Sequence, residues 1–221
     1  MSTKEESRGT LSSTDFGVAA SAFILNWNTI CSSFPQWTWV LSHHQVEGYL
    51  SLENILLSST QEEHGELSFP GPGKHSHQED PIDVDDATLV HINPCKVHYY
   101  DLHIIYCNSY RVPVLYFRAY DNDGEPLECD EIEKDLPAYS KKALSDSKWT
   151  FITQEEHPYL NRPWYKLHPC GTSEWMKLLF HADDDALAKT GVAIELYLVA
   201  WLSVVGLVVG LRIPFEMMKQ L

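Results

Sequence analysis

The spacing of apolar residues in the first quarter of the chain predicts one helix followed by a hairpin. Apolar side chains recur every three or four positions across residues 16–30, which is the period of an amphipathic helix. Thr14 or Asp15 can cap the start of this helix. Aromatic and aliphatic runs then follow at residues 37–41 and 46–57, with polar residues between them. They predict the first hairpin of an antiparallel sheet.

The rest of the ordered pattern predicts further strands followed by helices. Extended segments rich in β-branched and aromatic residues are expected at 96–107, 112–120, 149–153 and 163–167. Helices are expected at 130–136, 137–145, 174–181 and 191–205, with a last short one beginning at Pro214. This order predicts an α+β fold, in which an antiparallel sheet of about four or more strands is flanked by helices.

A segment of different composition interrupts the pattern at about residues 58–88. It is rich in Asp, Glu, Pro and Gly, and it has few residues that could offset the entropy of ordering. We therefore expect a disordered N-terminus over residues 1–13 and a single domain over 14–221 with a disordered acidic insertion. The insertion contains His64, His75 and His77, but their spacing favours a solvated loop over a metal site.

An uncharged apolar segment runs from Leu196 to Leu211. A membrane-spanning helix needs roughly 17 to 25 apolar residues, so this segment is slightly short. Gly206 and Gly210 also interrupt it. We therefore expect a buried helix followed by an extended edge, and no membrane span.

Composition and charge exclude several classes of function. Lys and Arg number 16 against 31 Asp and Glu, giving a formal net charge of −15, which disfavours nucleic acids and anionic lipid surfaces as partners. The five cysteines have no paired spacing, and the N-terminus lacks the features of a signal peptide. These features predict a cytoplasmic protein. Neither a GxGxxG nor a Walker sequence occurs, so no cofactor is expected.

Cys170 is the residue best placed for chemistry. It follows a proline and precedes Gly171 and the start of a helix, where the positive end of the helix dipole favours a thiolate. A thiolate can attack a thioester carbonyl. His168 lies two residues earlier and can position the loop by hydrogen bonding or assist proton transfer. A lone cysteine after a proline is also often a small buried residue, and Cys95 has a similar setting without the helix.

Three tracts of the chain resemble a known family. They are VPVLYFRAYDNDGEPL at 112–127, ITQEEHPYLNRPWYKLHPCGTSEWM at 152–176 and YLVAWLSVVGLVVGLRIP at 197–214. Together they look like the autophagy-related protein 10 family of E2-like conjugating enzymes, over about half of the chain. The lipid-conjugating family of autophagy-related protein 3 shares a similar His-Pro-Cys tract and is the alternative. The first strand tract, the ending and the short chain favour the former.

The resemblance implies an E2-like fold and a role for specific residues. Cys170 matches the cysteine that carries a glycyl thioester, and Thr153 matches a polar residue that supports the oxyanion or the loop, with Thr150 as its rival. The implied partners are autophagy-related protein 7 as the E1-like enzyme, autophagy-related protein 12 as the ubiquitin-like modifier and autophagy-related protein 5 as the lysine-bearing acceptor. The implied process is autophagosome formation.

Two other functions fit the same residues. One is a non-catalytic interaction module with an E2 fold, in which Cys170 is buried. The other is a cysteine hydrolase that uses Cys170 with His157 or His168. Candidate docking residues are the strand aromatics, which are equally compatible with an ordinary sheet core: Tyr99, Tyr100, Tyr116 and Phe117.

Overall fold

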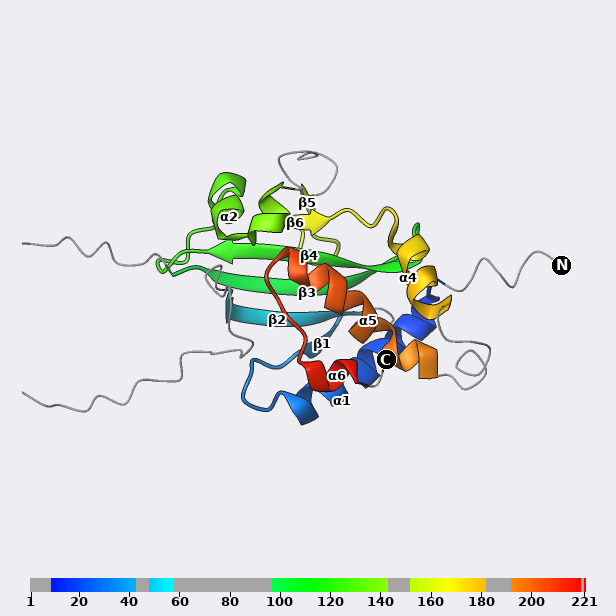
Figure 1. The fold of residues 1–221 in the computed structure, drawn as a ribbon. Helices are drawn as coiled ribbons and strands as arrows, with labels where there is room; N and C mark the ends of the chain where they lie inside the picture. Colours follow the sequence, from blue (N-terminus) through cyan, green and yellow to red (C-terminus); the bar gives the residue numbers. More distant parts are fainter. Residues whose placement is uncertain (1–8, 43–47, 58–96, 143–151, 182–191, 220) are drawn as a thin grey trace, which may run out of the picture.

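Six strands form one antiparallel sheet in the order β1-β2-β3-β4-β6-β5 (Figure 1). The computed structural model describes residues 9–42, 48–57, 97–142, 152–181, 192–219 and 221. The strands are β1 (Thr38–Leu41), β2 (Gly48–Leu56), β3 (Tyr99–Cys107), β4 (Val112–Tyr120), β5 (Ile152–Glu156) and β6 (Pro163–Leu167). The helices are α1 (Ser13–Ile30), α2 (Cys129–Asp135), α4 (Thr172–His181), α5 (Val192–Val208) and α6 (Phe215–Met218). The predicted α+β class with an antiparallel sheet is confirmed.

The central hairpin of the sheet is made by β3 and β4. The two strands pair without interruption from Tyr99↔Tyr120 to Cys107↔Val112. Their four-residue connection ends at Arg111, whose φ of 55° lies in the left-handed region and whose N–H donates to the Cys107 carbonyl at 2.7 Å. Both strands were predicted, because alternating aromatic and β-branched residues are a local signal.

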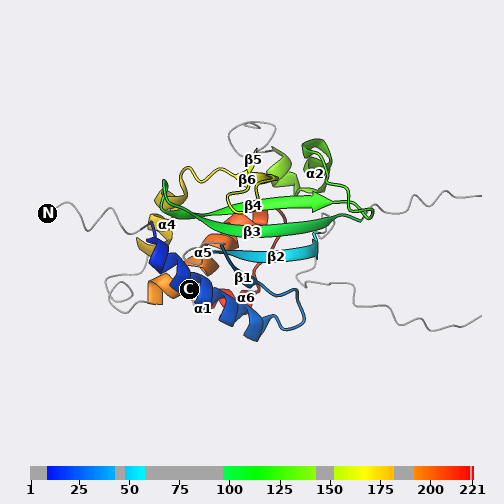
Figure 2. The same ribbon diagram turned by 180° about the vertical axis from the view of Figure 1, so that it is seen from behind.

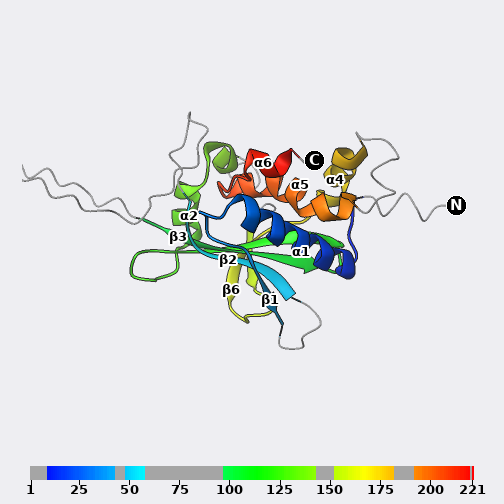
Figure 3. The same ribbon diagram turned by 90° about the horizontal axis from the view of Figure 1, so that it is seen from below.

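Helices α1, α5 and α6 cover one face of the sheet (Figure 3). The core lies between these helices and the strands, and it contains the buried side chains of Phe23, Trp27, Leu102, Leu115 and Trp201. Adjacent residues of a strand point to opposite faces, so this face takes Phe117 of β4 while the preceding residue points away from the helices. The helix layer therefore defines the buried side of the sheet.

Helix α1 begins earlier than its sequence suggested. Ser12 is the N-cap, not Thr14 or Asp15, and it forms a capping box with Asp15. The Asp15 N–H donates to Ser12 Oγ at 3.1 Å, and the Ser12 N–H donates to Asp15 Oδ2 at 3.2 Å. Residues 9–12, which we assigned to the N-terminal tail, also belong to the fold, because Leu11 is buried and its N–H donates to the Arg111 carbonyl. Contacts with distant elements order them, and sequence periodicity does not report such contacts.

Helix α5 ends in a glycine motif and not in the predicted extended edge. Gly210 has φ of 80°, and its N–H donates to the Leu207 carbonyl at 3.0 Å. The Leu211 N–H donates to the Gly206 carbonyl at 2.9 Å, which completes the pair of bonds typical of a Schellman motif. In the described part of the chain, no helix has both the length and the apolar character needed to cross a bilayer.

The last two strands do not continue the meander in chain order. Strand β6 pairs with β4, and among the described strands β5 pairs only with β6, which places β5 at the edge of the sheet (Figure 2). The predicted strand over 149–153 begins at Ile152 in the structure, and the residues before it lie outside the described part. The acidic insertion falls within residues 58–96, which also lie outside the described part.

Candidate functional site

Cys170 lies in a turn that joins the end of β6 to the start of α4. The Thr172 N–H donates to the Pro169 carbonyl at 3.1 Å, and Gly171 has φ of 78°, as at the third position of a type II turn. Glycine adopts this conformation without steric cost. The Cys170 thiol is free and exposed, whereas the Cys31 thiol is buried and burial raises its pKa to about 11. The turn therefore presents the Cys170 sulfur to solvent, and a buried packing role for it is excluded.

The side chain of His168 stabilises this turn through the backbone of Cys170. Its Nδ1 atom accepts a hydrogen bond from the Cys170 N–H at 3.1 Å. The ring of Tyr110, in the β3–β4 connection, packs edge-on against the His168 ring with centroids 5.9 Å apart. Because Nδ1 faces the backbone amide, the geometry fits the predicted positioning role better than proton transfer with the thiol.

Helix α4 begins at Thr172, two residues after Cys170. The N–H groups of Glu174 and Trp175 both donate to the Gly171 carbonyl at 3.1 Å. Within the ranges given above, the amides of Gly171 and Ser173 donate no hydrogen bond. Free amides at a helix start can donate hydrogen bonds to an anion beside them, such as the oxyanion that forms in acyl transfer.

Thr153 lies on β5, directly opposite Lys166 of β6. Its hydroxyl donates to Glu155 Oε1 at 3.1 Å, and Lys166 Nζ lies 2.8 Å from Glu155 Oε2. The hydrogen bond from Lys166 holds the pKa of the Glu155 carboxyl below its usual range. The Thr153 hydroxyl therefore bonds to Glu155, and it makes no hydrogen bond to Cys170. Thr150 lies outside the described residues.

His157 is fully buried and is not a base for Cys170. Its Nε2 atom lies 2.8 Å from Nδ1 of His103, and its Nδ1 atom accepts the Tyr159 N–H at 3.2 Å. Both rings pack among aromatic side chains on the sheet face opposite the helices, including Tyr49 and Trp164. Burial lowers the pKa of each imidazole to about 3, with the neighbouring histidine also lowering that of His157. A hydrolase built on His157 has no support in this geometry.

The strand aromatics that we considered as docking residues belong mainly to the core. Tyr100, Tyr116 and Phe117 are buried, and only Tyr99 is half-buried. Tyr100 also donates its hydroxyl hydrogen to Asp135 Oδ2 at 2.6 Å. The docking role is therefore wrong for the three buried residues. Cys95 lies outside the described residues.

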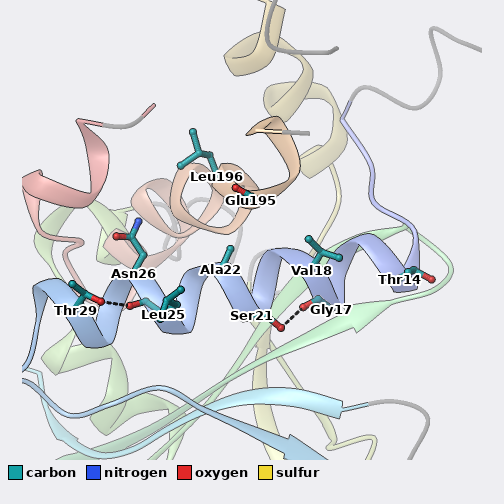
Figure 4. Close-up of a pocket in the computed structure, with 10 residues that line it drawn as sticks. All are labelled: Thr14, Gly17, Val18, Ser21, Ala22, Leu25, Asn26, Thr29, Glu195 and Leu196. Carbon is teal, nitrogen blue, oxygen red and sulfur yellow. Dashed lines mark hydrogen bonds between the residues drawn. The ribbon is translucent and has the colours of Figure 1, made fainter. Parts of the chain in front are cut away.

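A cavity of about 840 Å³ opens between α1 and α5 (Figure 4). Hydroxyl, amide and aliphatic side chains line it: Thr14, Gly17, Val18, Ser21, Ala22, Leu25, Asn26, Thr29, Glu195 and Leu196. Ser21 and Thr29 donate their hydroxyls to backbone carbonyls of α1 itself. No cysteine or histidine is among the described residues that line this cavity.

Comparisons with known proteins show that the chain is similar to a family of conjugating enzymes. The sequence profile of the family described as "Autophagocytosis associated protein, active-site domain" matches residues 15–216. The chain is 50% identical over 226 residues to the ubiquitin-like-conjugating enzyme ATG10 of Arabidopsis thaliana, with 99% of each chain covered. It is 32% identical over 194 residues to the ATG10 enzyme of Homo sapiens, covering 83% of this chain and 82% of the human one.

The alternative branch matches over a shorter region. The chain is 39% identical over 93 residues to autophagy-related protein 3 of Kluyveromyces lactis. That match covers 41% of this chain and 28% of the relative. The likeness over the whole chain therefore favours the first branch, as the sequence tracts indicated.

Proposed function

The chain belongs to the autophagocytosis-associated protein family with the active-site domain and is an E2-like conjugating enzyme of autophagy, and from this premise we propose that Cys170 carries a ubiquitin-like modifier as a glycyl thioester. The observation that supports this most directly is the exposed, free Cys170 thiol in a turn at the start of α4. This turn lies inside the matched family domain.

The first step is a thioester exchange. The Cys170 thiolate attacks the carbonyl carbon of the modifier's C-terminal glycine, which is bound as a thioester to an E1-like enzyme, autophagy-related protein 7. A new S–C bond forms at Cys170, and the sulfur of the E1-like enzyme leaves as a thiolate. Since one thioester replaces another, the step needs no additional energy source. The modifier in this proposal is autophagy-related protein 12.

The second step transfers the modifier to a lysine of autophagy-related protein 5. The neutral lysine amine attacks the thioester carbonyl, an isopeptide C–N bond forms, the C–S bond to Cys170 breaks and the amine proton is released. Amides at the start of α4 can donate to the developing oxyanion, each contributing roughly 3 kcal/mol when well aimed. Thr153 stays a second candidate for this role or for loop support. Holding both reactants on one protein supplies much of the remaining rate enhancement.

Glu155 is a poor choice for the base that accepts the lysine proton. Its carboxylate is paired with Lys166 at 2.8 Å, and this contact lowers its pKa. A lower pKa makes a carboxylate a weaker base. We therefore propose that solvent accepts the lysine proton.

We also place the reaction in the cytoplasm, where thiols stay reduced.

Substitution of Cys170 tests the proposal. The purified chain is incubated with the E1-like enzyme, the modifier, ATP and the acceptor. We expect the natural chain to form an adduct that a thiol reductant removes. Cys170→Ser should form an adduct that resists the reductant, because an oxygen ester replaces the thioester. Cys170→Ala should form none.

Cys107→Ser is the matched control, because Cys107 is also a free thiol but is half-buried at the end of β3. It should conjugate at the rate of the natural chain. Full conjugation by Cys170→Ala would refute the proposal. Replacing the protein acceptor by vesicles that contain an amino lipid separates the two branches, since product on lipid alone would indicate the lipid-conjugating reaction.

A further inference from the structure

Residues 9–12, here called the N-terminal strap, cross one end of the molecule beside the cysteine turn. The strap leads into α1 and lies against α4 (Figures 1 and 4). Tyr197 of α5 donates its hydroxyl hydrogen to the Gly9 carbonyl at 2.9 Å. Tyr106 of β3 donates its hydroxyl hydrogen to the Leu11 carbonyl at 2.7 Å. The helix layer and the sheet therefore both hold the strap in place.

One end of the strap touches the first turn of α4. A Cβ atom built on Gly9 would lie 1.9 Å from the Ser173 carbonyl oxygen and 2.8 Å from Cγ of Lys177. No real side chain tolerates such an approach to a backbone atom. The close contact with Ser173 by itself therefore requires glycine at this position. Ser173 is three residues from Cys170, so the strap contacts the helix turn that borders the nucleophile.

The other end of the strap touches the β3–β4 connection. The Leu11 N–H donates to the Arg111 carbonyl at 2.8 Å. The residue before Arg111 is Tyr110, whose ring packs edge-on against His168. His168 in turn accepts the Cys170 N–H. Two separate chains of contact thus run from the strap to the two sides of the Cys170 turn.

We propose that the N-terminal strap positions the Cys170 turn for acyl transfer, with Gly9 as its positioning residue. The inference rests on the proposed function, because positioning matters only if Cys170 reacts. The strap sets where the first turn of α4 and the His168 ring lie, and these in turn fix the direction of the Cys170 thiol. A displacement of the order of 1 Å at a reacting group costs up to about a hundredfold in rate.

The experiment compares Gly9→Ala with Gly17→Ala in the full-length chain. Gly17 lies on α1, and a methyl group added there would have nothing within 4 Å, so it is the matched control. Two rates are measured for each protein: alkylation of Cys170 by iodoacetamide across pH, and transfer of the modifier from Cys170 to lysine. We expect Gly9→Ala to slow transfer about tenfold and to change the alkylation rate, with an unchanged KM for the E1-like enzyme. Gly17→Ala should match the natural chain in both.

Tyr197→Phe supplies a variant without a clash, because it adds no atom and removes the hydroxyl that donates to the Gly9 carbonyl. It should slow transfer about threefold while the folded fraction, measured by circular dichroism, stays complete. Transfer rates equal to that of the natural chain in both Gly9→Ala and Tyr197→Phe would overturn the inference. So would a second result, in which the lower transfer rate of Gly9→Ala is fully explained by its unfolded fraction and Tyr197→Phe transfers at the natural rate. If the natural chain does not accept the modifier from the E1-like enzyme, the proposed function is refuted instead. The rate of Cys170 alkylation would still show whether the strap affects the Cys170 turn.

Discussion

At the scale of single residues, His168 and Cys170 are linked through the backbone and not through the thiol. The Nδ1 atom of His168 accepts the Cys170 N–H at 3.1 Å, and the Tyr110 ring packs edge-on against the His168 ring. A neutral hydrogen bond of this kind contributes about 1 kcal/mol. The residue therefore supports the shape of the turn, and its loss should affect catalysis without abolishing it.

We predict that His168→Ala slows transfer from Cys170 about fivefold, which is the rate equivalent of about 1 kcal/mol. His168→Asn should recover most of this loss, because the side-chain oxygen of asparagine can accept the same amide hydrogen. Single-turnover transfer from preloaded enzyme to lysine measures the effect. A loss of a thousandfold or more in both variants would instead indicate that the ring takes part in proton transfer.

At the scale of secondary-structure elements, the C-terminus of α5 illustrates how one residue ends a long apolar helix. The helix is followed by Gly210 in the left-handed region, and two hydrogen bonds return to the carbonyls of Gly206 and Leu207. A methyl group on Gly210 would meet only Cγ and Cδ of Pro137, at 3.7 and 4.0 Å, which is ordinary contact. The need for glycine is therefore conformational and not steric.

We predict that Gly210→Ala lowers the free energy of unfolding by about 1 to 2 kcal/mol, the cost of placing a non-glycine residue in the left-handed region. Gly17→Ala should instead raise it by up to about 1 kcal/mol, because alanine is the better helix former at an open helical position. Urea denaturation measures both. Equal midpoints for the two variants would show that the α5 motif does not depend on glycine.

At the scale of the whole molecule, local signals predicted the elements but not how they meet. Strands β3 and β4 and helix α1 follow from periodicity, and the position of Cys170 before a helix is visible in the sequence. The β4-β6-β5 order, the burial of Leu11 and the pairing of His103 with His157 depend on residues far apart in the chain. The cost of burying the polar ring of His157 is offset by its hydrogen bond to His103, which lies 54 residues away in the chain. No local sequence pattern encodes this pairing.

This histidine pair links the stability of the whole fold to pH. In the folded chain, burial keeps both imidazoles neutral, with the pKa of each lowered to about 3 from an ordinary 6.5. In the unfolded chain they bind protons as the pH falls through 6.5. The unfolded state therefore binds more protons between pH 6.5 and about 3, so stability is complete above this window and decreases as the pH falls through it.

We predict that the free energy of unfolding decreases between pH 7.5 and 5.5, with a slope that rises toward a limit of about 2.7 kcal/mol per pH unit for two protons. Urea midpoints at pH 7.5, 6.5 and 5.5 measure it, above the range in which most carboxylates titrate. His157→Gln should be less stable at pH 7.5 but show a shallower slope, because one of the two buried imidazoles is gone. His168→Asn should keep the full slope, because this variant retains both buried imidazoles of the pair. A midpoint that does not change between pH 7.5 and 5.5 would mean that the folded protein protonates His103 and His157 as readily as the unfolded chain does.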